Sequence, residues 1–188
     1  MDSLGPVQNE FEAAWKRRWP MALLAVPYEL KTRFSDRWVR FHCLPESKRY
    51  AENELECAIV LDRYNTILDE LFSGGDVYIV DVVYGAEAEF SGPGRVWRTI
   101  VSEDDPEFGS TYAHLFLSRA EWRRGSIDEA LRRVADDQDA GGVITDPQAR
   151  WLFHPYDGGM DVIAPTAADG DALRERHQDW LSRHPQGY

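Results

Sequence analysis

The stretch "DVYIVDVVYG", Asp76 to Gly85, decides the fold, because it is apolar on both of the sides that a β-strand presents. Successive side chains of a strand point to opposite faces of a sheet, so a strand that borders solvent on one face alternates between apolar and polar residues. In this stretch, the charged side chain that interrupts the apolar run is Asp81. The pattern predicts a central strand that is covered on both faces.

Further strand patterns lie on both sides of this central strand. They occupy residues 37–43, 95–102, 111–118, 142–145, 150–156 and 160–165. Asp157-Gly158 predicts a type I′ turn between the last two of these strands. The acidic residues 103–110 are interpreted as a solvated loop that separates two other strands. Because most of the strands are adjacent in sequence, the sheet is expected to be mainly antiparallel.

Helical spacing of apolar residues predicts four helices around these strands. The first lies within residues 9–20, and the longest follows Pro45 and ends at the "SGG" of residues 73–75. An S-x-x-E pattern at residues 126–129 predicts a capping box that opens the third helix. Residues 171–185 contain the last helix. The helices therefore occur at intervals between the strands, as in folds where helices flank a sheet.

Length and composition allow a single packed domain. The 188 residues are 43% hydrophobic and 12% aromatic, which is enough to fill a core without metal or disulfide support. Cys43 and Cys57 are too few for a disulfide framework or a zinc site, and they are interpreted as reduced thiols in or near the core. The expected fold is one α+β domain over residues 1–188, with a mainly antiparallel β-sheet packed against flanking α-helices.

No segment of the sequence predicts secretion or membrane insertion. The first twenty residues carry Asp2, Glu10 and Glu12 and have no uninterrupted apolar run of the kind found in secretory signals. The apolar stretches "MALLAV" and "VYIVDVVYG" are far shorter than a membrane span. We therefore expect a cytoplasmic protein that does not associate with a membrane.

The chain is strongly acidic. It contains 33 Asp and Glu residues against 21 Lys and Arg residues, which gives a formal net charge of -12 at pH 7. A negative field of this kind repels the phosphates of nucleic acid and attracts positively charged proteins. The expected partner is therefore a basic protein, and not nucleic acid.

One short segment nevertheless concentrates positive charge. The stretch "RFHCLPESKRY", residues 40–50, contains Arg40, His42, Lys48 and Arg49. If Arg40 and His42 share a strand face, and the other two cations lie just before the long helix, the four groups converge with the N–H groups of the helix start. They then form a candidate site for an anion such as a phosphate or a carboxylate.

Two other interpretations of these cations stay open. Glu46, Glu52, Glu54 and Glu56 lie within a few residues of them and are able to neutralise the cluster through ion pairs. In that interpretation, no ligand site remains. The cations are alternatively part of a patch that binds a partner protein.

The sequence carries no recognisable motif for catalysis, metal binding or cofactor binding. Cys43 follows His42, but adjacent strand residues point to opposite faces, so the two side chains do not form a cysteine–histidine pair. The histidines are scattered without zinc-site spacing, and there is no glycine-rich phosphate-binding motif. His154, Asp157 and Asp161 flank the predicted hairpin, where a solvated turn is favoured over a cation site. We expect no catalytic residue, no metal and no cofactor.

Several segments together carry a family resemblance. They are "FEAAWKRRWP" (11–20), "RFHCLPESKRY" (40–50), "YNTILDELF" (64–72), "VYIVDVVY" (77–84) and "WLFHPYDGGMDVIAPTAADGDALRERHQDWL" (151–181). In this order, they resemble the bacterial domain-of-unknown-function family 3885 over nearly the whole chain. Gly158-Gly159 departs from the more usual acidic and basic pair of that family, which argues against a turn that binds through charge.

The resemblance implies no reaction, cofactor or catalytic residue. It does imply that the chain is grouped with small bacterial accessory proteins, some of which are similar to immunity partners of toxins. Such proteins block a cationic site with carboxylates and a few aromatic anchors.

Acidic and aromatic residues supply the matching features in this chain. Residues 103–107 and 136–139 are acidic segments that steer a basic protein if they lie on one surface. The candidate partner-binding residues are the aromatic side chains Trp122, Phe108, Trp151 and Tyr156, together with Asp157 and Asp161. The expected function is that of a non-enzymatic acidic binding protein, of the immunity or antitoxin type, which inhibits a bacterial toxin by protein–protein contact.

The alternative is a small enzyme or ligand-binding protein that acts on an anionic small molecule at Arg40, His42, Lys48 and Arg49. A pocket lined by unpaired cations favours this alternative. A flat acidic and aromatic face without a deep cleft favours inhibition of a protein partner.

Overall fold

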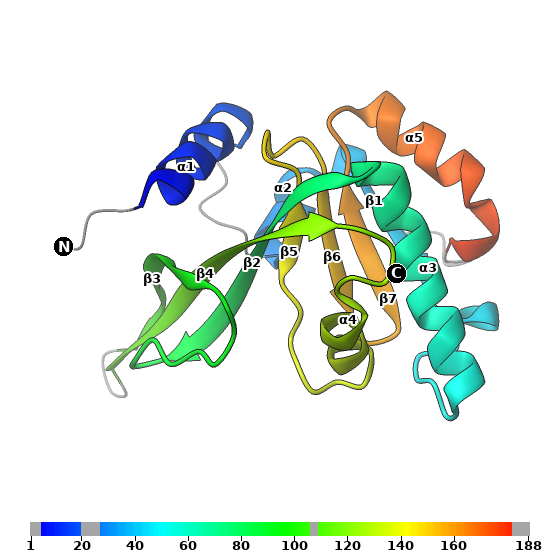
Figure 1. Ribbon diagram of the computed structural model, residues 1–188, viewed down its shortest axis with the longest axis horizontal. Coiled ribbons are helices and arrows are strands. Elements are labelled where there is room, and N and C mark those ends of the chain that lie inside the picture. The colour runs from blue at the N-terminus through cyan, green and yellow to red at the C-terminus, as the bar shows by residue number, and fades with distance from the viewer. Residues whose placement is uncertain (1–4, 20–26, 106–108, 182–188) are drawn as a thin grey trace.

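The computed structural model describes residues 5–19, 27–105 and 109–181. The strands of the described part form one seven-stranded sheet in the order β1-β7-β6-β5-β2-β4-β3, in which all neighbours are antiparallel (Figure 1). The strands are β1 (Trp38–His42), β2 (Gly75–Gly85), β3 (Arg95–Asp105), β4 (Gly109–Trp122), β5 (Val143–Thr145), β6 (Leu152–Tyr156) and β7 (Gly159–Ile163). The helices are α1 (Pro6–Arg18), α2 (Pro27–Arg33), α3 (Glu54–Phe72), α4 (Asp128–Ala135) and α5 (Ala167–Arg176). The predicted α+β class, with a mainly antiparallel sheet and flanking helices, is confirmed.

Strand β2 lies in the interior of the sheet, as its apolar sequence predicts. It pairs with β4 along its whole length, from Gly75 to Gly85, and with β5 through residues 78–80. Val77 belongs to one buried cluster, whereas Tyr78 and Val80 belong to the other. This part of the strand is therefore covered on both faces, which explains why the alternation of polar residues is missing there.

The two faces of the sheet are covered by different helices, and we name each face after one of them. On the α3 face, α3 is packed with α4 and α5 over a core that contains Phe41, Leu68 and Phe153. On the α1 face, α1 and α2 cover a second core that contains Trp15 and Tyr78. Figure 1 shows α4 in front of the sheet and α2 behind it. No helix in the described part of the chain combines the length and the apolar character that crossing a membrane requires.

Helix α1 contributes an aromatic cluster to the α1 face. The ring of Phe11 lies with its centroid 4.9 Å from the rings of both Tyr78 and Trp97. The indole Nε1 of Trp19 donates a hydrogen bond to the carbonyl oxygen of Ala149 at 2.8 Å. The helical spacing of these aromatic residues therefore reports a packed face of the helix, in agreement with its predicted amphipathic pattern.

The longest helix, α3, ends where its sequence predicts, and it begins at Glu54. Asn53 caps its first turn by accepting a hydrogen bond from the backbone N–H of Glu56 at 3.1 Å. Its C-cap, Ser73, has a left-handed conformation with φ of 47°, and Gly74 follows it at φ of 78°. The apolar residues between these ends, among them Ile67, are buried against the sheet.

Two predictions about local structure near the strands are wrong. The acidic residues 103–105 belong to β3 and pair with residues 109–111 of β4, so this part of the expected loop is strand. Backbone pairing extends the hairpin because an acidic residue keeps the backbone N–H and C=O groups that ladder hydrogen bonds need. At the turn between β6 and β7, Gly158 has a φ of 82° but Asp157 does not have a positive φ, so the turn is not type I′.

Two predictions about helix ends are also wrong. Helix α4 begins at Asp128 without a side-chain cap, because the hydroxyl oxygen of Ser126 instead accepts a hydrogen bond from the backbone N–H of Arg123 at 3.3 Å. Helix α5 begins at Ala167 and ends at Arg176, and a 3₁₀ turn follows at residues 178–180. The start is earlier than expected because Thr166 caps it by accepting a hydrogen bond from the N–H of Asp169 at 3.2 Å.

Candidate functional site

Arg40 is held in an ion pair on the α1 face of the sheet. Its Nε and Nη2 atoms donate to the two carboxylate oxygens of Asp161 at 3.0 and 3.4 Å. Asp161 lies directly opposite Arg40 in the β1–β7 register, and it also accepts a hydrogen bond from the hydroxyl of Tyr156 at 3.2 Å. The carboxylate that neutralises Arg40 thus comes from β7, and not from the glutamates that follow Arg40 in sequence.

The two histidines of this region share the α1 face with Arg40, and both are shifted toward the neutral form. Burial lowers the pKa of His42, and the positive charges of Arg40 and Arg63 lower it further. Burial lowers the pKa of His154 to about 4. The Nε2 atom of His42, the Nδ1 atom of His154 and the Nε1 atom of Trp38 are buried, and none of them has a hydrogen-bond partner among the described residues. This face therefore presents neutral imidazoles beside a compensated arginine.

Lys48 and Arg49 do not join Arg40 and His42 at a common site. The ammonium group of Lys48 lies 2.7 Å from a carboxylate oxygen of Glu56 and 3.0 Å from one of Glu52. Arg49 pairs with Asp157 at 2.6 Å. Each strong cation of the predicted anion site therefore faces a carboxylate.

Glu54 of the same segment contacts a different residue. Glu54 does not neutralise the cluster, because it pairs with Arg132 of α4. The pair links the first turn of α3 to α4, which packs beside it.

Trp122 is not an exposed anchor, so this part of the predicted partner surface is wrong. Its side chain is 2% exposed, and its indole Nε1 donates to a carboxylate oxygen of Asp69 at 3.0 Å. It lies opposite Gly75 at the end of β4 and packs into the core of the α3 face. The apolar indole is buried there because α3 covers this end of the sheet.

The other predicted anchors are engaged within the protein to different degrees. Trp151 is partly buried against the core of the α3 face, and Tyr156 is half-buried with its hydroxyl on Asp161. Asp157 is paired with Arg49, and Asp161 is 9% exposed. Phe108 lies outside the described residues. These side chains do not form an open acidic and aromatic surface.

Cys43 is buried on the α3 face, opposite to His42. Its side chain is fully buried, and burial raises the pKa of its thiol to about 12. A thiol with this pKa stays protonated at neutral pH and is a poor nucleophile. The geometry agrees with the alternation along β1 that separates these two neighbouring residues.

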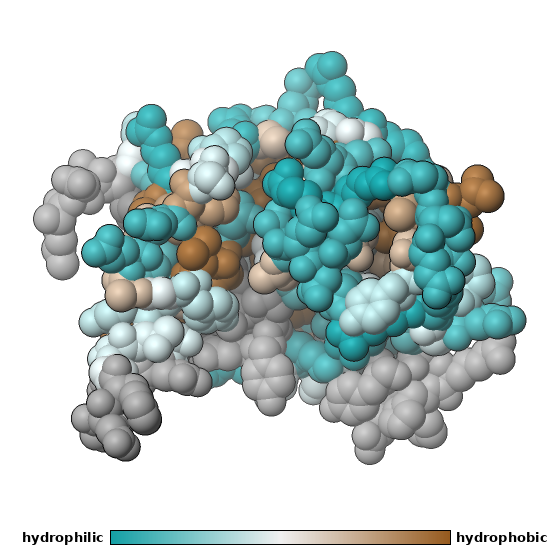
Figure 2. Space-filling view, turned by 90° about the horizontal axis from the view of Figure 1, so that it is seen from below, coloured by the Kyte–Doolittle hydropathy of each residue, from teal (hydrophilic) through white to brown (hydrophobic). Residues whose placement is uncertain are grey.

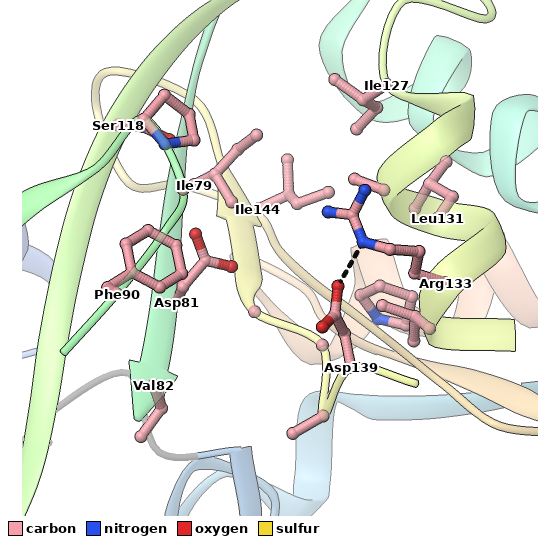
Figure 3. Close-up of a pocket in the computed structure, with 18 of the residues that line it drawn as sticks. Ile79, Asp81, Val82, Phe90, Ser118, Ile127, Leu131, Arg133, Asp139 and Ile144 are labelled. Carbon is pink, nitrogen blue, oxygen red and sulfur yellow. Dashed lines mark hydrogen bonds and ion pairs between the residues drawn. The ribbon is translucent and has the colours of Figure 1, made fainter. Parts of the chain in front are cut away.

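A large hollow lies on the α3 face, away from Arg40, between α4 and the segment 86–94. Its volume is about 700 Å³, which is within the range of ligand-binding pockets. We call it the Asp81 hollow, because Asp81 projects into it from β2 (Figure 3). Seen from below, the molecule shows hydrophobic surface set between hydrophilic areas (Figure 2).

The hollow lies over a part of the sheet that is covered neither by α4 nor by the segment 86–94. Helix α4 covers one side of the gap with Leu131 and Val134. On the other side, the chain after β2 folds back so that the ring of Phe90 stacks on Phe116 of β4, with centroids 4.5 Å apart. A side chain at Gly92 would collide with the Phe90 ring, because its Cβ would lie 2.3 Å away. The middle of β2 stays uncovered between them.

Asp81 makes no hydrogen bond or ion pair with any residue that the structure describes. Burial raises the pKa of its carboxyl group to about 6, and the nearby charge of Asp139 adds to the shift, whereas Arg133 opposes it. Arg133 is itself engaged, because its Nε donates to Asp139 at 2.7 Å on the α4 side of the hollow (Figure 3). The site therefore holds a carboxyl group that titrates near neutral pH and lacks a cation of its own.

Comparison with known protein families matches residues 26–185 to the family described as "Domain of unknown function (DUF3885)". The chain belongs to this family. No curated protein and no solved structure matches the chain. The DUF3885 match includes both Arg40 and Asp81, whereas α1 precedes it.

The sequence patterns missed the Asp81 hollow within the DUF3885 region. The signal that points to it is the isolated charge of Asp81 in a strand that is otherwise apolar on both faces. A carboxylate in such a strand requires a partner, a raised pKa or an opening to solvent. The structure supplies the second and the third of these, which makes Asp81 the leading candidate for a functional residue.

Proposed function

We propose that this chain is a non-enzymatic acidic binding protein that engages a basic protein partner, in the manner of an immunity or antitoxin-like protein that inhibits a toxin. The observation that carries the proposal is the Asp81 hollow, a large opening whose central carboxyl group has no cationic partner among the described residues. A protein with a net charge of -12 attracts basic partners over long range, and a hollow of this kind gives such a partner a place to anchor.

The distribution of ion pairs supports a cationic partner over an anionic one. Arg40, Lys48 and Arg49 each face a carboxylate within 3.0 Å. An anion at this segment would have to compete with those carboxylates and would be repelled by the overall charge. The alternative function, an enzyme or binding protein for an anionic small molecule at these cations, therefore has weaker support.

A combination of capture and kinetics tests the proposal. The immobilised protein is incubated with a lysate of its host at low ionic strength, and the retained proteins are identified by mass spectrometry. Each retained protein is then purified, and its association rate is measured between 20 and 300 mM NaCl. We expect a basic partner whose association rate falls about tenfold or more over this range, because salt screens the steering field.

Growth measurements test the inhibitory part of the proposal. We expect that expression of the retained partner alone arrests growth and that coexpression of this chain restores it. An association rate that is indifferent to salt, or a partner with a net negative charge, contradicts the proposed function. Growth arrest that coexpression does not relieve contradicts the toxin-inhibitor role.

A further inference from the structure

The lining of the Asp81 hollow carries an excess of negative charge. Its charged residues are the four carboxylates Asp81, Glu89, Glu129 and Asp139 and the two guanidinium groups of Arg119 and Arg133. Both guanidinium groups are engaged: Arg119 with Asp76, and Arg133 with Asp139 and Glu129. An occupant with a positive charge is therefore favoured over a neutral or anionic one.

The rest of the lining is mainly apolar. Ile79 of β2 and Ile144 of β5 form the floor, and Leu131 of α4 forms a wall with Ile127, which directly precedes that helix (Figure 3). An occupant that binds well must bury an apolar part against these side chains while it brings its charge to Asp81. A hydrated inorganic cation has no such part, so the lining favours an organic cation.

The surroundings of the Asp81 carboxylate distinguish between the two organic cations that proteins carry. A Cβ atom built on Gly142 would lie 2.8 Å from Oδ1 of Asp81, so the backbone of Gly142 is packed against this oxygen. A guanidinium group binds best when both carboxylate oxygens are open to its planar fork. An ammonium group is a point charge that needs only one oxygen, and its four-carbon stem matches an apolar wall.

We propose that the Asp81 hollow receives a lysine side chain of the protein partner, with its ammonium group against Asp81 and its stem against Ile79 and Leu131. This inference rests on the proposed function and names the group by which the partner is held. Because the hollow is large, the neighbouring residues of the partner enter with the lysine, and apolar neighbours fit the lining best.

Binding of lysine is linked to pH through Asp81. The charged groups that face Asp81 are Glu129 and Arg133 of α4 and Asp139 beyond it, with Glu89 and Arg119 at the rim. The ammonium group binds the ionised carboxylate, so protonation of Asp81 competes with binding. Because the pKa of this carboxyl group is about 6, the affinity is expected to be about tenfold lower at pH 5 than at pH 7.

Peptide titration tests this inference with defined probes. The probes are blocked pentapeptides of sequence Leu-Ala-X-Ala-Leu, in which X is lysine, arginine or norleucine, and binding is followed by ¹H–¹⁵N NMR at pH 7. We expect the lysine peptide to shift the amide signals of Ile79, Leu131 and Gly142. We expect the norleucine peptide to bind at least tenfold more weakly, because it lacks the charge.

Two matched variants separate Asp81 from the general charge of the protein. Asp81→Asn is expected to lower the affinity for the lysine peptide at least tenfold and to abolish the difference in affinity between pH 5 and pH 7. Glu175→Gln removes the same charge from an exposed position on α5 and is expected to leave binding unchanged. Unshifted amides in the hollow, equal binding of norleucine, tighter binding of arginine, or equal effects of the two variants overturns the inference.

The partner retained by capture distinguishes this inference from the proposed function. If that partner binds wild type with a salt-dependent rate and binds the Asp81→Asn variant equally well, the lysine inference is wrong and the proposed function stands. If the variant binds the partner and the lysine peptide more weakly by a similar factor, the lysine inference and the proposed function are both supported.

Discussion

Arg40 and Asp81 are charged residues in strands of the same sheet, but they lie on opposite faces and differ in what surrounds them. Arg40 pairs with Asp161 from the neighbouring strand, whose carboxylate compensates its charge. Asp81 faces apolar side chains, Asp139 and the guanidinium group of Arg133, which is paired with Asp139, and burial raises its pKa to about 6. The first arrangement fixes the sheet internally, whereas the second leaves a charge that an external cation is able to satisfy.

The difference has opposite consequences for stability. Removal of one partner of a buried ion pair leaves the other charge uncompensated and is strongly destabilising. Removal of a charge that has no partner relieves a desolvation cost and is neutral or stabilising. The two sites therefore predict opposite responses to the same kind of substitution, an aspartate replaced by asparagine.

Asp161→Asn is expected to have the largest effect. It removes the carboxylate charge that pairs with Arg40, whose side chain is 21% exposed, and it weakens the hydrogen bond from Tyr156. We expect a loss of about 3 kcal/mol in the free energy of unfolding, at the low end for a buried pair because Arg40 is partly exposed. Denaturation by urea at pH 7 measures this change.

Two further variants sharpen the result for Asp161. The double variant Arg40→Met with Asp161→Leu replaces both charges by apolar groups and is expected to recover most of the lost stability. Asp171→Asn removes a carboxylate from an exposed pair with Arg174 and serves as the control. A loss below about 1 kcal/mol for Asp161→Asn, or a double variant as unstable as the single one, contradicts the structural role of the pair.

The second prediction concerns the dependence of stability on pH. The folded protein raises the pKa of Asp81 from 3.8 to about 6, so below pH 6 the native state holds a proton that the unfolded state releases. Asp81 therefore adds stability as the pH falls from 6 to 4. The pKa of His154 is instead lowered from 6.5 to about 4, so His154 removes stability as the pH falls through the same window.

Single substitutions separate these opposing contributions. When the pH falls from 6.5 to 4, the free energy of unfolding of Asp81→Asn is expected to decrease by about 2 kcal/mol more than that of wild type, after allowance for solvent screening. For His154→Gln, the decrease is expected to be about 2 kcal/mol smaller than that of wild type. Urea denaturation across this range gives both differences, in which the contributions of the other carboxylates cancel. Curves that stay parallel to wild type, or that shift in the same direction, contradict the assignment of the two groups.

Local patterns in the sequence predicted the elements that form the sheet. The apolar run of β2 and the alternation of β1 depend on which faces are buried, and burial is encoded residue by residue. The S-x-x-E pattern misplaces the start of α4, because Ser126 accepts a hydrogen bond from the backbone N–H of Arg123 and so does not cap the helix. Competition between two such local hydrogen bonds is not visible in a motif.

The functional geometry was harder to predict, because it depends on contacts between distant residues. Arg40 and Asp161 are 121 positions apart in sequence, so nearby glutamates were the visible candidates for neutralising Arg40. The hollow requires the ring of Phe90 to stack on Phe116 of β4 while α4 packs over β6. Neither contact produces a periodic pattern in the sequence. The isolated charge of Asp81 does mark the strand that lies between them.

The smallest expected effect belongs to Lys48, whose two glutamate partners lie at the surface. Its ammonium group contacts Glu52 and Glu56, but solvent and salt screen such pairs, and ordering of long side chains offsets the attraction. Lys48→Met is therefore expected to leave the urea midpoint unchanged within experimental error, in contrast to Asp161→Asn. A loss comparable to that of Asp161→Asn would place Lys48 among the structural ion pairs. It would also remove the distinction between surface neutralisation and the buried pairing that holds β1 to β7.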